Sequence, residues 1–336
     1  MDWCKYLGNI NVNAVIAGNS SRPGEQFASH VVLFWYYTRM TSEAHIFLGI
    51  DGGGSRCRAR LRDSQGALLG EGEGGPANIY QDFEGSAISI LAAAKAATVS
   101  AGLSEARMAE FHAGMGLAGI ISSQSAGRLR SQGLPFAALT LINDAHAACL
   151  GAHSGGDGGI VIAGTGSAGY VIVDGKGIGI GGWGFELGDD GSGAIMGREA
   201  VRRAVLSIDG LGPSTPLTEH ILAELGRSQP ALTAWSRSAK SIDYARFAPD
   251  IFRFSGLGDE AAGEIVAKAV GSVFGMAKRL LQLGAPLLSM LGGLSGPLKQ
   301  QMSPSLAAFF IEPAADATDG AIMAARQAAG LPEDWA

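Results

Sequence analysis

Cysteine is scarce in this sequence of 336 residues. Cys4, Cys57 and Cys149 lie far apart and form no C-x-x-C pair. This spacing supplies neither a zinc site nor an iron–sulfur site, and an odd number of separated thiols is not a disulfide framework. We therefore expect a cytoplasmic protein with reduced, mostly buried thiols.

Charge is also sparse, at 17% of residues, and the formal net charge is −6. Non-specific binding to nucleic acid or to an anionic membrane needs basic clusters, which this balance does not favour. The most apolar run, VVLFWYY at 31–37, is far shorter than the ~20 residues of a membrane span and has neither the basic flank nor the cleavage site of a secretory signal. We expect no nucleic-acid partner and no membrane partner.

The first 40 residues differ from the rest because they show few helical or strand periods. The first clean strand pattern, IFLGI, begins at residue 46. We therefore expect residues 1–40 to be an N-terminal extension that the fold does not need. An ordered arm packed by the aromatic residues at 34–37 is the alternative.

Glycine, by contrast, is abundant, with 51 residues, and forms G-x-G-x-x-G at Gly164, Gly166 and Gly169. A dinucleotide fingerprint needs a helix after these glycines. Residues 170–173 (YVIV) instead predict a strand, and the Asp-Gly pair at 174–175 predicts a hairpin turn. A protein-kinase loop would be accompanied by V-A-I-K, H-R-D and D-F-G, and a Walker A loop by G-x-x-x-x-G-K-[ST]; the sequence contains none of them.

The glycines are therefore predicted to join two strands. Consecutive backbone N–H groups in such a turn can bind phosphate, and Thr165 and Ser167 add hydroxyl donors. A glycine-rich turn with no ligand is the alternative.

The predicted elements follow the same order twice, which indicates an α/β protein with two similar halves. In the first half three strands precede alternating helices and strands; these segments are 46–51, 57–63, 67–74, 83–101 (helix), 111–115, 124–131 (helix), 138–142 and a helix from 145. The second half repeats this from Gly159; its segments are 159–166, 168–175, 177–182, 193–207 (helix), 260–283 (helix), 287–291, 309–311 and 318–329 (helix). A glycine turn closes the first hairpin of each half, and two such turns facing each other would hold a polyphosphate from opposite sides.

Six segments in this order carry a family resemblance: GIDGGGSRCRARLRD (49–63), GPANIY (75–80), LINDAHAACLGAH (141–153), IAGTGSAG (162–169), GGWGFELGDDGSGAIMG (181–197) and LGGLSG (291–296). The sequence resembles the acetate kinase, sugar kinase, Hsp70 and actin superfamily. It is most similar to the BadF/BadG/BcrA/BcrD ATPase family, in the branch of N-acetylglucosamine kinase and bacterial glucosamine kinase.

The resemblance covers residues 46 to about 330. It implies duplicated ribonuclease H-like (actin-like ATPase) domains with a cleft between them. Residues 41–155 would form an N-terminal lobe with a phosphate loop and a catalytic aspartate. Residues 156–336 would form a C-terminal lobe with a second phosphate loop and an adenosine loop.

The implied activity is an ATP- and Mg²⁺-dependent kinase that phosphorylates N-acetylglucosamine or glucosamine at the 6-hydroxyl. One alternative is an ATPase that activates another enzyme, which would need cysteines for a subunit-bridging iron–sulfur cluster. Another is a non-catalytic sugar sensor, which we would expect to lack the base or the phosphate turns. Relatives in this branch are often dimers, so the resemblance leaves a homodimer open.

Two aspartates are the candidates for the chemistry. Asp144 follows an apolar strand and precedes a helix, which is where the family has its catalytic base. The alternative for Asp144 is a helix N-cap, and both roles could coexist with Asn143 beside it. Asp51 ends the first strand, and its carboxylate could hold Mg²⁺ through water, or could simply be a turn residue before glycines.

The remaining site residues are implied by the matching family positions. Those expected to bind the ATP phosphates are Gly52, Gly53, Gly54, Ser55, Gly164, Thr165, Gly166 and Ser167, and those of the adenosine loop are Gly292 and Gly293. Those expected to bind the sugar, besides Asp144, are Asn78, Gly182, Trp183 and Asp189. The alternatives are a core aromatic for Trp183, a helix cap for Asp189, and an ordinary strand-to-helix turn for the glycine pair.

Overall fold

The computed structural model describes residues 45–120 and 123–332. The expected N-terminal extension lies outside the described residues, so its role stays a prediction. The described residues from Phe47 onward form one compact unit.

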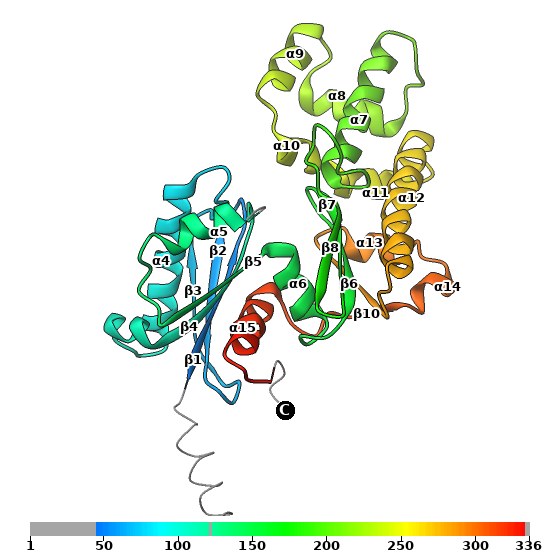
Figure 1. The fold of residues 1–336 in the computed structure, drawn as a ribbon. Helices are drawn as coiled ribbons and strands as arrows, with labels where there is room; N and C mark the ends of the chain where they lie inside the picture. Colours follow the sequence, from blue (N-terminus) through cyan, green and yellow to red (C-terminus); the bar gives the residue numbers. More distant parts are fainter. Residues whose placement is uncertain (1–44, 121–122, 333–336) are drawn as a thin grey trace, which may run out of the picture. The chain divides into compact units, whose positions relative to one another are not determined.

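The first sheet has five strands in the order β3-β2-β1-β4-β5 (Figure 1). The strands are β1 (Ile46–Gly52), β2 (Cys57–Arg62), β3 (Leu68–Gly74), β4 (Phe111–Leu117) and β5 (Ala138–Asn143). The first three pair antiparallel, and β4 pairs parallel to β5. The helices of this part of the chain are α4 (Phe83–Ser100), the 3₁₀ helix η1 (Glu105–Glu110), α5 (Ser123–Arg130) and α6 (Asp144–Ala152).

The second sheet repeats this arrangement in the order β10-β9-β6-β7-β8. Its strands are β6 (Gly158–Ala163), β7 (Ser167–Val173), β8 (Lys176–Gly181), β9 (Leu288–Leu291) and β10 (Phe310–Ile311). Again three strands pair antiparallel, and the parallel strand β9 pairs with the first of them. The duplicated α/β fold expected from the sequence is therefore confirmed.

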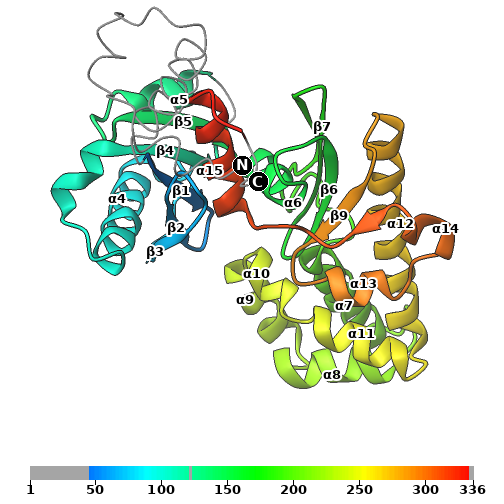
Figure 2. The ribbon, with the colours of Figure 1, turned by 90° about the horizontal axis from the view of Figure 1, so that it is seen from below.

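A group of helices fills the chain between β8 and β9 (Figure 2). They are α7 (Gly193–Ile208), α8 (Pro216–Leu225), α9 (Gln229–Ser238), α10 (Ser241–Ala245), α11 (Ala248–Gly256) and α12 (Glu260–Gln282). Their apolar faces share one buried core with β6, β7 and β9. The sequence pattern predicted α7 and α12 but no element from α8 to α11. After β9, the described residues form three further helices: α13 (Ser295–Lys299), α14 (Pro304–Ala307) and α15 (Ala317–Ala328).

Alternate glycines let α4 lie directly on the backbone of β3. A Cβ at Gly72 would lie 2.5 Å from the Ala93 carbonyl oxygen, and one at Gly74 would lie 2.2 Å from that of Ser89. Real Cβ atoms essentially never approach so closely. The G-E-G-E-G pattern therefore places small residues under the helix and glutamates on the other side of the strand.

Two helices connect the sheets through a close crossing. The last helix of the described residues, α15, packs on β4 and β5 of the first sheet, and α6 packs on β6 and β7 of the second sheet while also contacting β4 and β5 of the first (Figure 1). At their crossing, a Cβ at Gly320 would lie 1.9 Å from the Ala147 carbonyl oxygen. The expected division at residues 155 and 156 is not tested, but the last helix of the expected second lobe packs on the sheet of the first.

An ion-pair network joins β2 to the start of α15. The arginines at alternate positions of β2 reach two aspartates at the N-terminus of that helix: Arg60 lies 2.9 Å from Asp316, and Arg62 lies 2.7 Å from Asp319. Asp319 is almost fully buried, so these pairs are less screened than surface pairs.

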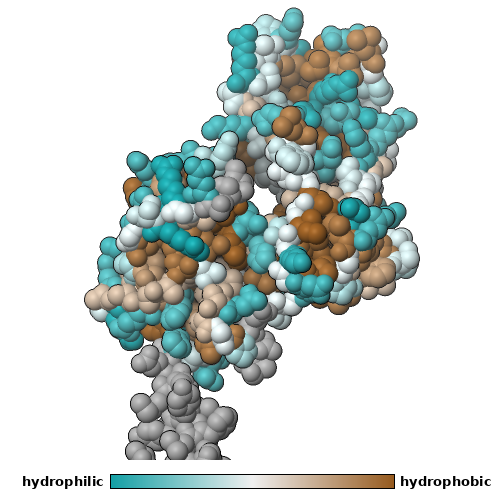
Figure 3. All heavy atoms as spheres, viewed as in Figure 1, coloured by the Kyte–Doolittle hydropathy of each residue, from teal (hydrophilic) through white to brown (hydrophobic). Residues whose placement is uncertain are grey.

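The face of the molecule in Figure 3 mixes hydrophilic and hydrophobic residues. Among the helices of the described residues, none is both long and apolar enough to cross a membrane.

Candidate functional site

The first glycine turn lies where β1 and β4 end together. The Ala118 N–H donates to the Gly52 carbonyl at 2.8 Å, and the Ala77 N–H donates to the Gly53 carbonyl at 2.8 Å. These bonds place the GPANIY segment beside the turn. Gly54 and Ser55 are exposed at its tip, so their polar groups are accessible to a ligand.

Asn78 is held in this segment by its own side chain. Its Oδ1 accepts hydrogen bonds from the backbone N–H groups of Tyr80, at 3.1 Å, and Gln81, at 3.3 Å. Gly119, after β4, approaches so closely that a Cβ there would lie 2.9 Å from this oxygen. Any sugar contact of Asn78 would therefore be made mainly by its amide NH₂ group.

Asp144 does not cap α6, because Asn143 does. The Asn143 Oδ1 accepts from the His146 N–H at 2.6 Å, which is the N-cap bond of this helix. Asp144 Oδ1 accepts only from the adjacent Ala145 N–H, at 2.9 Å, and no described residue donates a hydrogen bond to Oδ2. The cap alternative therefore belongs to Asn143, and Asp144 keeps a free oxygen.

The pKa of Asp144 is raised above the ordinary aspartate value. Its side chain is accessible to solvent. Enough protein surrounds the carboxyl, however, that desolvation raises this pKa, and the negative charge of Asp51 raises it further. The strands β4 and β5 end together at Leu117 and Asn143, and the Ala118 N–H bonds the Gly52 carbonyl at the end of β1. Asp51 and Asp144 therefore lie at the same edge of the first sheet. A raised pKa suits a group that must take up a proton.

Asp51 is held by Arg58, which was not among the expected site residues. The Arg58 Nη2 donates to Asp51 Oδ2 at 2.6 Å, and its Nη1 lies 3.4 Å from Asp316 Oδ2. The signal was present in CRARLR, because every second residue of β2 is an arginine and strand alternation places all three arginines on one face. Arg58 therefore ties the candidate metal ligand to the N-terminus of α15.

The donor set at this edge fits a hydrated Mg²⁺ ion. Two carboxylates interact electrostatically, and no described residue donates a hydrogen bond to Asp51 Oδ1 or Asp144 Oδ2. Hard cations that retain several waters bind to such oxygens.

The second glycine turn lies against the expected adenosine loop. Gly292 has a φ of 96°, and a Cβ there would lie 2.3 Å from the Ala163 carbonyl oxygen. The Leu294 N–H donates to the same carbonyl at 3.0 Å. Two of the expected ATP-binding segments thus come together at the carboxyl ends of β6 and β9, a place where only glycine fits.

Ser167 has a different environment from Thr165. Its hydroxyl donates to the Asp190 carbonyl at 2.9 Å and its side chain is buried, whereas Thr165 is exposed. Of the two hydroxyls expected to bind phosphate, only that of Thr165 is available in this structure. The backbone carbonyls of Gly164 and Thr165 accept from the first N–H groups of α7, so the turn is fixed to that helix.

Trp183 and Asp189 line one pocket of about 370 Å³, together with Ser167. Trp183 is 75% exposed, so the core-aromatic alternative is wrong. Asp189 has a φ of 62°, and Ser192, not Asp189, caps α7. Desolvation raises the Asp189 pKa, while hydrogen bonds from the backbone at Ser167 and Gly184 oppose the rise.

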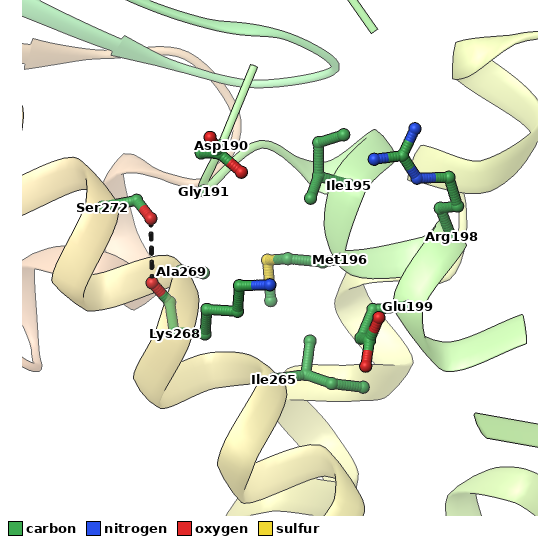
Figure 4. A pocket seen from close by; sticks show the side chains of 10 residues that line it. All are labelled: Asp190, Gly191, Ile195, Met196, Arg198, Glu199, Ile265, Lys268, Ala269 and Ser272. Carbon is green, nitrogen blue, oxygen red and sulfur yellow. Dashed lines mark hydrogen bonds between the residues drawn. The ribbon is translucent and has the colours of Figure 1, made fainter. Parts of the chain in front are cut away.

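A smaller pocket of about 80 Å³ adjoins the first between α7 and α12 (Figure 4). The two share Asp190 and Ser272. Lys268 lines only the smaller one, and its backbone carbonyl accepts from the Ser272 hydroxyl at 3.1 Å.

The structure thus forms three groups from the expected residues. Asp51, Asp144, Asn78 and the first glycine turn share the edge of the first sheet. The second turn meets Gly292 and Gly293, and Trp183 and Asp189 share a pocket next to Gly182. Their roles toward ATP and sugar remain predictions.

The described cysteines do not suit a shared cluster. Cys57 and Cys149 are free and buried, and burial raises the pKa of each thiol to about 12. Both thiols are therefore protonated at neutral pH. Cys4 lies outside the described residues.

Comparison with known proteins agrees with this architecture. The family model of the BadF/BadG/BcrA/BcrD ATPase family matches residues 48–321. Glucosamine kinase GspK of Vibrio cholerae is 36% identical over 287 residues, which are 85% of this chain and 96% of that one. N-acetyl-D-glucosamine kinase of Dictyostelium discoideum is 27% identical over 256 residues, 70% of this chain and 79% of that one.

A solved structure from Chromobacterium violaceum, named "Putative N-acetylglucosamine Kinase", superposes with a TM-score of 0.77 at 33% identity. The match covers 84% of this chain and 99% of that one. Together with the match of the family model over most of the sequence, these similarities establish that the chain belongs to the BadF/BadG/BcrA/BcrD ATPase family.

Proposed function

We propose that the protein is an ATP- and Mg²⁺-dependent kinase that phosphorylates an amino sugar, glucosamine or N-acetylglucosamine, at its 6-hydroxyl. One observation carries the proposal: Asp144 is accessible and lies beside Asp51 at the first glycine turn, and it does not cap α6 because Asn143 does. The names of the relatives, glucosamine kinase and N-acetyl-D-glucosamine kinase, support the same chemistry.

In this proposal Asp144 is the general base. Phosphoryl transfer needs an in-line hydroxyl and stabilisation of charge, and little other help from the protein. The free Oδ2 of Asp144 accepts the proton of the 6-hydroxyl as its oxygen bonds to the γ-phosphorus and the bond from that phosphorus to the β-phosphate oxygen breaks, which releases ADP; the Ala145 N–H holds Oδ1 in place. The raised pKa makes the carboxylate a better proton acceptor than an ordinary aspartate.

Asp51 would hold Mg²⁺, which when bound neutralises charge on the phosphates. Arg58 donates to Asp51 Oδ2, so Asp51 Oδ1, to which no described residue donates, would be left for the ion or one of its waters. The backbone N–H groups of the two glycine turns would bind the phosphates, and the loop at Gly292 would accept the adenosine.

The pocket at Trp183 favours glucosamine within this class. Its lining includes Asp189 and Asp190, and contains no lysine, arginine or histidine among the described residues. Two carboxylates without a cation attract the ammonium group of glucosamine more than a neutral acetamide. The exposed indole provides a flat surface for a sugar ring.

The test compares purified wild type with Asp144→Asn and a matched control, Asp209→Asn. Asp209 is an exposed aspartate at the C-terminus of α7. Loss of a general base lowers kcat by ~10²–10⁴-fold, and the control should match wild type. Phosphorylation of each sugar is followed side by side as kcat/KM.

The outcomes separate the alternatives. Wild-type turnover in Asp144→Asn would remove Asp144 as the base. ATP hydrolysis at the same rate with and without sugar would favour the activating ATPase, and sugar binding without turnover in wild type would favour a sensor. The homodimer and the cytoplasmic location remain predictions.

A further inference from the structure

Three potential metal ligands converge in the helical part of the second lobe. His220 and Glu224 lie one turn apart on α8, so their side chains share a helix face. Asp250, on α11, completes the group, and the three ligand atoms all lie within 4.8 Å of one another. None of these residues belongs to the proposed kinase site.

The distances from His220 Nε2 to the two carboxylate oxygens suit one zinc ion bound by all three residues. Its Nε2 lies 3.3 Å from Glu224 Oε1 and 3.2 Å from Asp250 Oδ2. Two nitrogen or oxygen ligands of a tetrahedral zinc ion, each about 2.0–2.2 Å from the metal, are separated by roughly 3.3–3.5 Å.

The Nε2 atom of His220 is itself buried and forms no acceptable hydrogen bond with any described residue. A proton on Nε2 would not be aligned for a hydrogen bond to either carboxylate. The two carboxylate oxygens lie within ion-pair distance of Nε2 but accept no well-aligned hydrogen bond from it, whereas a metal ion would use the lone pair of Nε2 and both carboxylate oxygens at once.

The outer oxygens of both carboxylates are already held. Arg246 Nη2 lies 3.1 Å from Glu224 Oε2, and Arg253 Nη2 lies 2.7 Å from Asp250 Oδ1. Each carboxylate thus keeps the oxygen facing His220 free of arginine. Partners of this kind orient metal ligands in known sites. Glu224 is exposed, so an ion and its remaining water ligand could enter from solvent.

We infer that His220, Glu224 and Asp250 form a binding site for a divalent transition-metal ion, Zn²⁺ by its ligand set, that joins α8 to α11. The site needs no sugar, ATP or Mg²⁺ and does not depend on the proposed kinase activity.

The experiment uses the full chain, stripped with a chelator and reloaded with ZnCl₂ or, in parallel, MgCl₂. Bound metal is counted by mass spectrometry after desalting, and the Tm is recorded. The variants are His220→Gln and Glu224→Gln, with Glu219→Gln as the control. Glu219 lies on the same helix but bonds Ser214 and Arg227 instead.

We expect one zinc ion per wild-type chain and a Tm that rises with ZnCl₂ but not with MgCl₂. The control should behave like wild type, while His220→Gln and Glu224→Gln should lose zinc affinity by at least ~10-fold. Absence of zinc from the wild type with an unchanged Tm would show a histidine–carboxylate ion-pair network and overturn the inference. Full zinc retention in His220→Gln would also overturn it.

Discussion

Gly320→Ala should disturb the crossing between α15 and α6. A Cβ at this position would lie 1.9 Å from the Ala147 carbonyl oxygen and 2.6 Å from the Gly151 N–H nitrogen. Both atoms belong to the backbone of α6, so no side chain can rotate away. Because the interior is close-packed, the two helices must separate by about 1 Å.

Whether Gly320→Ala lowers or raises the free energy of unfolding shows which contribution is larger, the packing clash or the gain in helix propensity. Overpacking costs about 1–3 kcal/mol, and alanine regains up to about 1 kcal/mol of helix propensity over glycine. Gly263→Ala, in α12, is the control, because a Cβ there meets nothing within 4 Å. The control should therefore stabilise the protein by about 0.5–1 kcal/mol, whereas Gly320→Ala should destabilise it by up to about 2 kcal/mol.

The same movement should reach the kinase site, because Asp144 is the first residue of α6. A displacement of about 1 Å at a reacting group can lower a rate by ~10²-fold. Urea unfolding followed by circular dichroism gives the free energies, and steady-state kinetics gives kcat. A Gly320→Ala protein that is as stable and as active as Gly263→Ala would refute the packing argument.

Three further predictions concern the site. The kcat/KM of the wild type should fall as pH decreases through the raised Asp144 pKa, since the base must be ionised, so the acidic limb should lie above that of an ordinary aspartate; a pH–rate profile checks this. Arg58→Gln removes the partner of Asp51, and the uncompensated charge should move that limb to still higher pH, whereas an unchanged limb would show that Arg58 is only structural. Trp183→Ala should raise the sugar KM by up to ~10-fold, corresponding to about 1.4 kcal/mol, with an unchanged Tm because the indole is exposed; an unchanged KM would remove Trp183 from the sugar site.

Periodicity alone gave the long elements to within a residue or two. The helix expected at 83–101 is α4, Phe83–Ser100, and that expected at 260–283 is α12, Glu260–Gln282. Long helices repeat their apolar spacing often enough to be recognised. The helices α8 to α11 were missed because they are short, at ten residues or fewer. Thr-Pro at 215–216, a cap followed by proline at the first helical position, was a signal that could have predicted α8.

Local sequence could not assign the separate roles of polar residues that lie close together in the chain. Asn143 and Asp144 both suit an N-cap, and only the hydrogen bond to His146 shows that Asn143 takes it. Ser167 and Thr165 both suit phosphate, yet the Asp190 carbonyl engages Ser167. In each case the deciding partner or geometry appears only in three dimensions.

The sequence by itself determined the two glycine turns, the repeated order of strands and helices, and the family, because each follows from residues close together in the chain. The tertiary structure decided that α15 returns to the first sheet, that Arg58 links Asp51 to Asp316, and that His220 meets Asp250. These pairings depend on how elements pack across long separations. Many other residues of the chain have side chains that could form the same contacts, so no local pattern specifies these pairings.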